Sequence, residues 1–197
     1  MQSVIGGLPL ETGLCGPIQI LRYFLLLILF DLLSGVIATN RACGAKSLVL
    51  LRAGWKRWFQ QILLRALCAV CCAALVILLP VYLAWPEPDT LNGWMLFSLY
   101  AAACAAIQVF LIAYTQNAAV GLVPVIFLQL CSVFLSKLLP GNWKLLLFGN
   151  WGCYLRTTSA GEEQGVSLLA CIALDLAAPL LIYWIGWRLV RRHHQKR

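Results

Sequence analysis

The chain has 197 residues, of which 62% are hydrophobic and only 11% are charged. Soluble domains carry about a quarter of charged residues, so this composition and a mean hydropathy of +0.85 exclude an ordinary soluble domain. The net charge of +8 does not indicate nucleic-acid binding, because the cations border apolar runs instead of covering a polar domain.

Apolar runs of about 20 residues follow one another along the chain, each long enough to cross a bilayer as a helix. In lipid the backbone must satisfy its own hydrogen bonds, which a helix does. The predicted spans are residues 18–39, 62–85, 94–115, 119–139 and 167–187. We therefore expect an all-α polytopic membrane protein that forms one membrane domain over residues 1–197.

The loop between the first two spans predicts a cationic amphipathic helix at residues 47–61. Its apolar face recurs at helical spacing: Leu48, Leu51, Trp55, Phe59 and Ile62. Its polar face holds Lys56, Arg57, Gln60 and Gln61, with Arg52 at the charged border and Trp58 beside the apolar face. Such a helix is typical of a membrane interface. It serves either as an anchor on anionic headgroups or as a docking surface for another protein.

The distribution of lysine and arginine predicts the orientation. Residues 40–61 and the tail 188–197 hold five each, whereas residues 1–17 and 86–93 hold none. Alternation of the predicted spans places both basic segments on one side, and the positive-inside rule assigns that side to the cytoplasm. We expect a cytoplasmic carboxyl terminus.

Residues 140–166 are too long and too apolar for a simple exposed hairpin, yet their apolar stretch is too short to cross a bilayer. We expect a short re-entrant or interfacial helix pair before the last span. An aromatic belt at the interface is the alternative.

The polar residues within the spans are candidates for function. Asp31 and Asp175 are costly in lipid, so each should face other helices or a wet cavity. They lack the sequence contexts of intramembrane aspartyl proteases, so we predict no catalytic residue and keep a catalytic pair as a weaker alternative. Gln108 and Gln129 are expected to form interhelical hydrogen bonds. All four are candidates for lining a substrate path.

The cysteines do not predict a metal site or a disulfide framework. Six lie in apolar runs and should pack as small hydrophobic residues: Cys68, Cys71, Cys72, Cys104, Cys131 and Cys171. Cys68-x-x-Cys71 has no second pair and no nearby histidine. Pairing of Cys15 with Cys153 stays open, since both fall on the predicted outer side.

Two stretches resemble a known family. LLRAGWKRWFQQILLRAL resembles the cytoplasmic helix that leads into a span in small permease subunits of bacterial ABC-2-type exporters, especially lantibiotic-protection and peptide-antibiotic transporters. LLPGNWKLLLFGNWGCYLR resembles the Pro-Gly-Asn-aromatic segment before the last span of these permeases. The resemblance covers residues 18–192. The family begins with one more amphipathic helix and span, so we expect that the first span is lacking here.

The resemblance implies a permease of the bacterial plasma membrane that exports a peptide or another amphipathic substrate. Residues 47–61 would dock on a cytosolic ABC ATPase through Arg52, Trp55, Lys56, Arg57, Trp58 and Phe59. A second permease chain, identical or different, would complete the path. This sequence has no P-loop, so ATP and Mg²⁺ would bind the partner ATPase and no cofactor is expected here. A non-catalytic immunity or assembly protein is the alternative.

Overall fold

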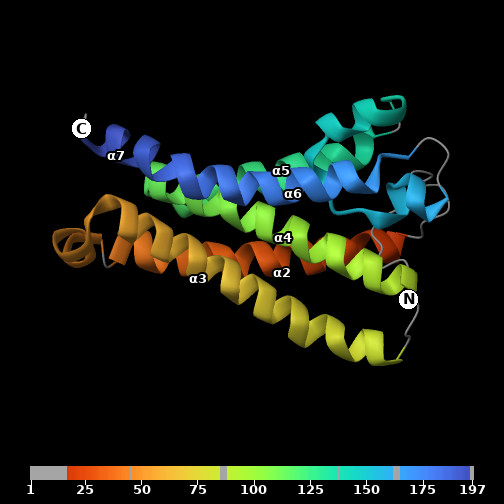
Figure 1. Cartoon of the computed structure of the whole chain (residues 1–197), viewed down its shortest axis with the longest axis horizontal. Helices are drawn as coiled ribbons and strands as arrows, with labels where there is room; N and C mark the ends of the chain where they lie inside the picture. The colour runs from red at the N-terminus through yellow and green to blue at the C-terminus, as the bar shows by residue number, and fades with distance from the viewer. Residues whose placement is uncertain (1–16, 45, 85–87, 137, 162–164, 196–197) are drawn as a thin grey trace.

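Long helices packed side by side form the protein in a computed structural model (Figure 1), which describes residues 17–44, 46–84, 88–136, 138–161 and 165–195. The helices are α2 (Pro17–Thr39), α3 (Lys46–Ala84), α4 (Pro88–Thr115), α5 (Ala118–Leu135), α6 (Leu168–Leu181) and α7 (Trp187–Gln195). A π-helical turn, η2 (Asn40–Gly44), follows α2, and another, η7 (Ile182–Gly186), joins α6 to α7. Within these described residues, four stretches are long and apolar enough to span a membrane: Ile20–Ala42, Gly54–Ile77, Leu91–Thr115 and Leu168–Gln195. The predicted all-α polytopic fold is confirmed.

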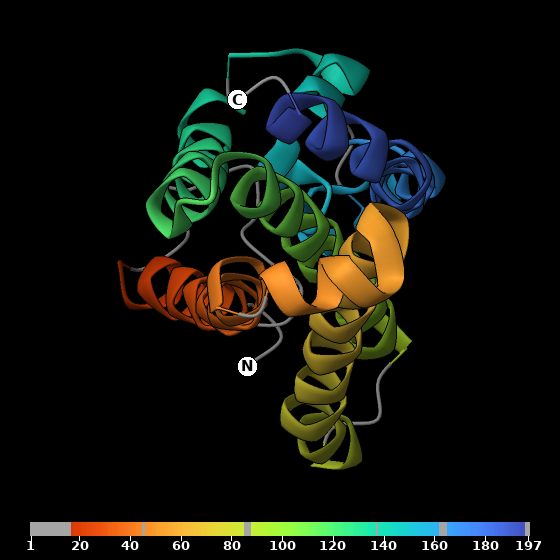
Figure 2. The same cartoon turned by 90° about the vertical axis from the view of Figure 1, so that its left-hand side faces the viewer.

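Helix α4 lies at the centre of the bundle, in contact with α2, α3, α5 and α6. In its apolar stretch 61% of the residues are buried, against 33% or less in the other long helices. Residues 101–106 are alanines and one cysteine. Small side chains let neighbouring helices approach closely in a membrane protein, which accounts for the central position of α4 (Figure 2).

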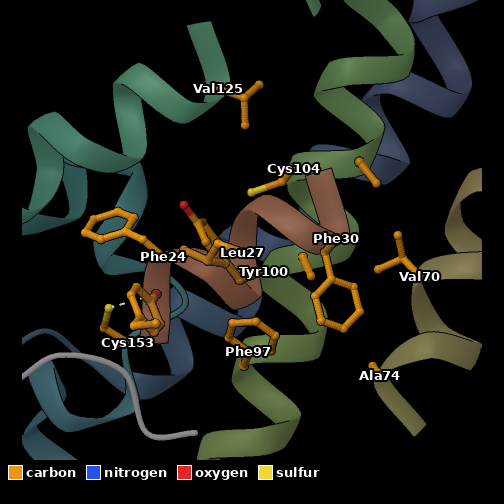
Figure 3. Packing of buried hydrophobic residues seen from close by; sticks show 13 residues of the cluster. Phe24, Leu27, Phe30, Val70, Ala74, Phe97, Tyr100, Cys104, Val125 and Cys153 are labelled. Atoms are coloured by element: carbon orange, nitrogen blue, oxygen red, sulfur yellow. Dashed lines mark hydrogen bonds between the residues drawn. The ribbon is translucent and has the colours of Figure 1, made fainter. Parts of the chain in front are cut away.

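The core has two main clusters along the bundle. One lies between α2, α3 and α4, where Phe97 makes T-shaped contacts with Tyr23 and Phe30 at centroid distances of 6.3 and 5.6 Å; Figure 3 shows its packing. The other lies toward the carboxyl terminus, where Phe59 and Val190 are buried together with residues of α4.

The structure divides the amphipathic helix predicted at residues 47–61 into two parts: the part up to Ala53 lies before a kink, and the part from Trp55 continues into the next helix. The chain bends at Gly54 (φ 74°, ψ 164°), a backbone conformation that favours glycine. From Trp55 to Ala84 the helix continues, so the predicted boundary between residues 61 and 62 is not where the chain turns. The reason is that the apolar face of Phe59 runs on into Ile62 and Leu63, and all three are buried in the bundle.

Two other predicted boundaries also differ. The fourth predicted span, 119–139, is shorter, because α5 ends at Leu135 and its apolar stretch covers Ala118–Ser132. At this end of α5 the Ser136 hydroxyl forms hydrogen bonds with the carbonyl oxygen of Ser132 and with Asn150 Oδ1. The predicted tail at 188–197 is helical as far as Gln195, where α7 ends.

Residues 140–166 do not form the predicted helix pair in their described part. They form short 3₁₀ turns, η3 (Gly141–Leu146), η4 (Phe148–Asn150), η5 (Tyr154–Arg156) and η6 (Thr158–Ala160). Glycines at 149 and 152 recur too often for a stable α-helix. The 3₁₀ turns bury Cys153 and Tyr154 against the helices, which a flat interfacial helix could not do.

Segments that are far apart in sequence meet at the two ends of the bundle (Figure 1). Residues 40–44, 46–58 and 115–118 meet α7 at one end, which we call the basic end. The start of α2, the start of α4 and residues 140–161 meet at the other, which we call the turn-rich end. The two basic segments thus lie at the same end of the bundle, as the predicted orientation requires.

Candidate functional site

Aromatic and histidine rings hold the basic end together. The Trp55 ring stacks on His194, with centroids 5.3 Å apart and planes 17° from parallel. His193 stacks on Tyr114 at 4.0 Å. The Nε2 atom of His194 lies 2.9 Å from the carbonyl oxygen of Ala113. The segment after Gly54 is therefore fixed to both α7 and the end of α4.

The residues predicted to dock on a partner divide into two groups. Trp58 and Phe59 are 1% and 0% exposed, so their rings pack inside this chain and are not presented to a partner. Lys56 and Arg57 are exposed, and Trp55 is half-buried. The Arg52 side chain lies outside the part that the structure describes.

A buried polar cluster lies between α2, α4 and α5, near the middle of the bundle. The Asp31 carboxyl lies beside the side chain of Gln129, and Gln129 Nε2 donates to Cys104 Sγ at 3.3 Å. The Ser34 hydroxyl donates to Gln108 Oε1. The structure therefore brings together Asp31, Gln108 and Gln129, three of the four predicted path residues, and all three are buried.

The fourth, Asp175, approaches the cluster from α6. It is buried and lies within electrostatic reach of Cys104, as Asp31 does. Neither of its carboxyl oxygens has a hydrogen-bond partner among the described residues. A directly bonded catalytic pair would require a hydrogen bond between Asp31 and Asp175. The described residues contain no such bond.

Polar groups continue from this cluster toward the turn-rich end. Tyr100 lies one helical turn from Cys104 on α4, and its buried hydroxyl has no hydrogen-bond partner among the described residues. The Tyr23 hydroxyl lies 3.2 Å from Cys153 Sγ, the contact drawn as a dashed line in Figure 3. Tyr23 also lies within electrostatic reach of Arg156. We call this series from Asp31 to Arg156 the polar file.

The polar file ends in a buried arginine. Arg156 Nη1 donates to Ser136 Oγ and to Asn150 Oδ1, both at 2.6 Å. Asn150 Nδ2 in turn donates to the carbonyl of Lys144 at 2.8 Å. The guanidinium therefore connects the end of α5 to the 3₁₀ turns.

Among the described residues, two cavities open on the helix surfaces, and neither is lined by members of the polar file. The larger, of about 250 Å³, lies between α3 and α4 and is lined by Cys71, Trp94 and neighbouring apolar residues. The other, of about 230 Å³, lies between α4 and the last helix. Neither is lined by Asp31, Gln108, Gln129 or Asp175, so these two cavities do not form the predicted path.

The cysteines differ in their surroundings. Cys104 and Cys171 are buried as predicted, but Cys68, Cys71 and Cys72 are exposed on α3. Cys153 is a free thiol among the described residues, while Cys15 lies outside them.

Sequence reasoning missed several residues of these sites. Tyr100, Cys104 and Gln108 recur every four residues on α4, a spacing that places them on one helix face and that could have revealed the polar file. His193 and His194 were treated as part of a tail, and no sequence signal placed them against Trp55. No protein-family model, curated protein or solved structure matches this chain.

Proposed function

We propose that this chain is a membrane-spanning permease subunit of an ABC-2-type transporter in the bacterial plasma membrane. It would couple a separate cytosolic ATPase, which binds ATP and Mg²⁺, to export of a peptide or another amphipathic substrate. The observation that carries the proposal is the unbroken helix after Gly54, which joins an exposed cationic surface to a membrane span.

The continuity of α3 supports a coupling role. A force on Lys56 or Arg57 would act directly on the helix proposed to cross the membrane, because Gly54 is the one position of α3 with a non-helical backbone and its proline, Pro80, lies near the far end. The buried Trp58 and Phe59 rings hold that helix against its neighbours. These two residues would therefore transmit movement within the permease, while Lys56 and Arg57 would contact the ATPase.

The proposed orientation follows from the charges of the basic end. Arg188, Arg191 and Arg192 are exposed on the last helix, as Lys56 and Arg57 are on α3. Their gathering at one end favours a cytoplasmic location for that end and for the carboxyl terminus.

The outer half of α3 offers a surface for the second permease chain. Val76 and Leu83 are among its most exposed side chains. In a single chain this face would contact lipid. In a dimer of identical or different permeases it would pack against the partner, with the substrate path between the two chains.

Co-expression tests the proposal. The proposal predicts an ATPase reading frame beside the gene for this chain. The two proteins are co-expressed at full length, and the complex is purified in detergent. We expect the wild type to retain the ATPase and Lys56→Glu to retain about tenfold less, since a charge pair at a protein interface contributes about 1.5 kcal/mol or more. Arg22→Glu is the matched control, because Arg22 is an exposed cation of α2 near the turn-rich end.

Two outcomes would count against the coupling role. One is a wild-type chain that retains no ATPase. The other is equal retention by the Lys56→Glu and Arg22→Glu variants.

A non-catalytic immunity or assembly protein is the second candidate. The observation in its favour is that Asp31, Gln108, Gln129 and Asp175 are buried and line neither of the two cavities found among the described residues. A protein that acts by occupying the membrane beside a partner needs no path. Protection of cells against a peptide antibiotic that persists after deletion of the ATPase gene would favour this function.

A further inference from the structure

The inference concerns the outward face of α3, where Arg65 lies inside an apolar stretch long enough to span the membrane, Gly54–Ile77. Its side chain is exposed, and its guanidinium makes no hydrogen bond or ion pair with the described residues. A cation that faces hydrocarbon is costly unless it reaches an anionic partner or the membrane interface. Residues 32–86 contain no aspartate or glutamate, so α3 itself offers no such partner.

A stripe of exposed side chains connects this cationic region to a cavity. Its members recur at alternating spacings of four and three residues, which places them on one face of the helix: Arg57, Gln61, Leu64, Cys68, Cys71 and Leu75. Arg65 borders the stripe about one turn after Gln61. The polar side chains lie toward the basic end and the apolar ones follow, which is the order of headgroup and tail in a phospholipid.

The cavity of about 250 Å³ between α3 and α4 lies at the apolar end of this stripe. Cys71, Ala74 and Leu75 form its α3 wall. The α4 wall includes Ser98, whose hydroxyl already donates to the carbonyl oxygen of Trp94 at 2.9 Å. Apolar cavities take apolar ligands in preference to water, so the wall suits a hydrocarbon chain.

The lengths fit one lipid molecule. Ten residues separate Arg65 from Leu75, which is about 15 Å at 1.5 Å per residue. Half of the hydrocarbon core of a bilayer is also about 15 Å, so an acyl chain whose headgroup lies at Arg65 reaches the cavity. Arg57 lies about 12 Å nearer the basic end, and both long side chains can extend toward a headgroup between them.

A helix of a second chain fits this place less well. A helix with its side chains is about 10 Å thick or more, so it would cover the cavity without entering it. In a symmetric pair α3 would face α3 and bring cation to cation. Val76, on the face offered to a second permease chain, lies about 100° round the helix from Leu75, so a lipid in the cavity leaves that face open.

We propose that α3 and α4 form a binding site for an anionic phospholipid of the leaflet at the basic end. Arg57, Gln61 and Arg65 hold the headgroup, and one acyl chain follows the stripe into the cavity. All of these groups belong to this chain, so the site does not depend on the proposed ATPase partner.

The test uses the full-length chain in detergent and two lipids, phosphatidylglycerol and phosphatidylcholine, each with a photoactivatable diazirine near the end of one acyl chain. Peptide mass spectrometry after illumination locates the labels. We expect phosphatidylglycerol to label residues 71–75 and 94–98, and phosphatidylcholine to label them at least fivefold less. This comparison in the wild type is informative even if a variant fails to fold.

The headgroup site is tested by removing one charge. Arg65→Gln should lower labelling by phosphatidylglycerol about fivefold, since a cation beside an anionic membrane contributes about 1 kcal/mol. Arg65→Lys should keep most of the labelling. Arg22→Gln is the matched control, because Arg22 is an exposed cation of α2 near the turn-rich end.

The cavity is tested by filling it. Cys71→Phe should remove the label from residues 94–98 with either lipid, because the ring occupies the place of the acyl chain. Cys72→Phe should keep the label, since Cys72 is also exposed on α3 but does not line the cavity.

Four results would overturn the proposal. Equal labelling by both lipids in the wild type would show an apolar groove without a headgroup site. Labels spread evenly over the exposed helix faces would show ordinary contact with the bilayer. Loss of the label in excess glycerol phosphate at constant ionic strength would assign the cations to a soluble anion. Cross-links between the Cys71 thiols of two copies, without a lipid label, would place a second chain over the cavity.

Discussion

His194 near the end of α7 stacks on Trp55, the first residue after the bend at Gly54. The contact joins the two most basic segments of the chain at one end of the bundle. It also means that the cationic surface of α3 and the carboxyl-terminal helix form a single unit, which a partner would meet together.

The first prediction tests this contact. Trp55→Ala should free α7 and speed tryptic cleavage after Arg191 and Arg192 about fivefold, because an aromatic pair contributes about 1 kcal/mol. His194→Ala should have a similar effect, and the double variant should add little to either. Trp143→Ala is the control, since Trp143 is exposed and lies at the turn-rich end. Fully additive effects would show that the two rings are not coupled.

The second prediction concerns the close approach of η7 to α3. A Cβ atom on Gly186 would lie 2.8 Å from Cζ of the buried Phe59 ring. Gly186→Ala should therefore lower the free energy of unfolding by about 1–3 kcal/mol, measured as a fall in melting temperature in detergent. Gly35→Ala, where nothing lies within 4 Å, should leave stability nearly unchanged. Phe59→Leu should partly restore the stability of Gly186→Ala, and a lack of rescue would contradict the explanation.

The third prediction concerns the buried arginine at the turn-rich end. Asn150→Leu removes an acceptor from Arg156 and leaves its charge less satisfied, at a cost of about 2–4 kcal/mol. Asn150→Asp should cost less, because it keeps acceptor oxygens for Arg156 and Ser136. Thermal unfolding measures both, with the exposed Asn40→Leu as the control. Equal stability of the two Asn150 variants would show that the guanidinium does not depend on this acceptor.

The fourth prediction is a pH dependence. Burial raises the pKa of Tyr154 above its usual value of 10.0, and the neighbouring Asp89, which accepts its hydroxyl at 3.0 Å, adds to the increase. The folded state then holds this proton more tightly than the unfolded chain. Its contribution to stability is present below pH 10 and is lost as the pH rises through the folded pKa. The loss in alkaline solution should be smaller in Tyr154→Phe, and an identical loss would contradict the assignment.

The fifth prediction tests the proposed orientation. Single cysteines are introduced at Arg191 and at Thr158 in a cysteine-free background. In intact cells a membrane-impermeant maleimide should label position 158 and should label position 191 only after the membrane is opened. The reverse pattern would place the basic end outside and remove the basis for docking a cytosolic ATPase.

The apolar runs were enough to predict the helices, because run length and charge determine which segments can cross a bilayer. They could not predict the bend at Gly54. The hydrophobic periodicity from Phe59 onward is the same for a helix lying on the membrane and for one entering it. Only the burial of Trp58 and Phe59 by other helices distinguishes the two.

The polar file was predictable in part. Asp31, Gln108 and Gln129 were identified because polar groups are rare in spans, and the structure brings them together. Arg156 was not identified, since an arginine in a connecting segment is normally exposed. Its burial depends on acceptors that come from α5 and from the 3₁₀ turns, which no local sequence pattern relates to one another.

The bend at Gly54 separates a short segment from a long helix that would tilt as one unit. From Trp55 to Ala84 the helix is about 45 Å long at 1.5 Å per residue. A tilt of about 5° at its cationic end would displace the far end by about 4 Å at that length. Small movements imposed at Lys56 and Arg57 would thus be amplified on the opposite side of the membrane, where α3 already diverges from its neighbours (Figure 2).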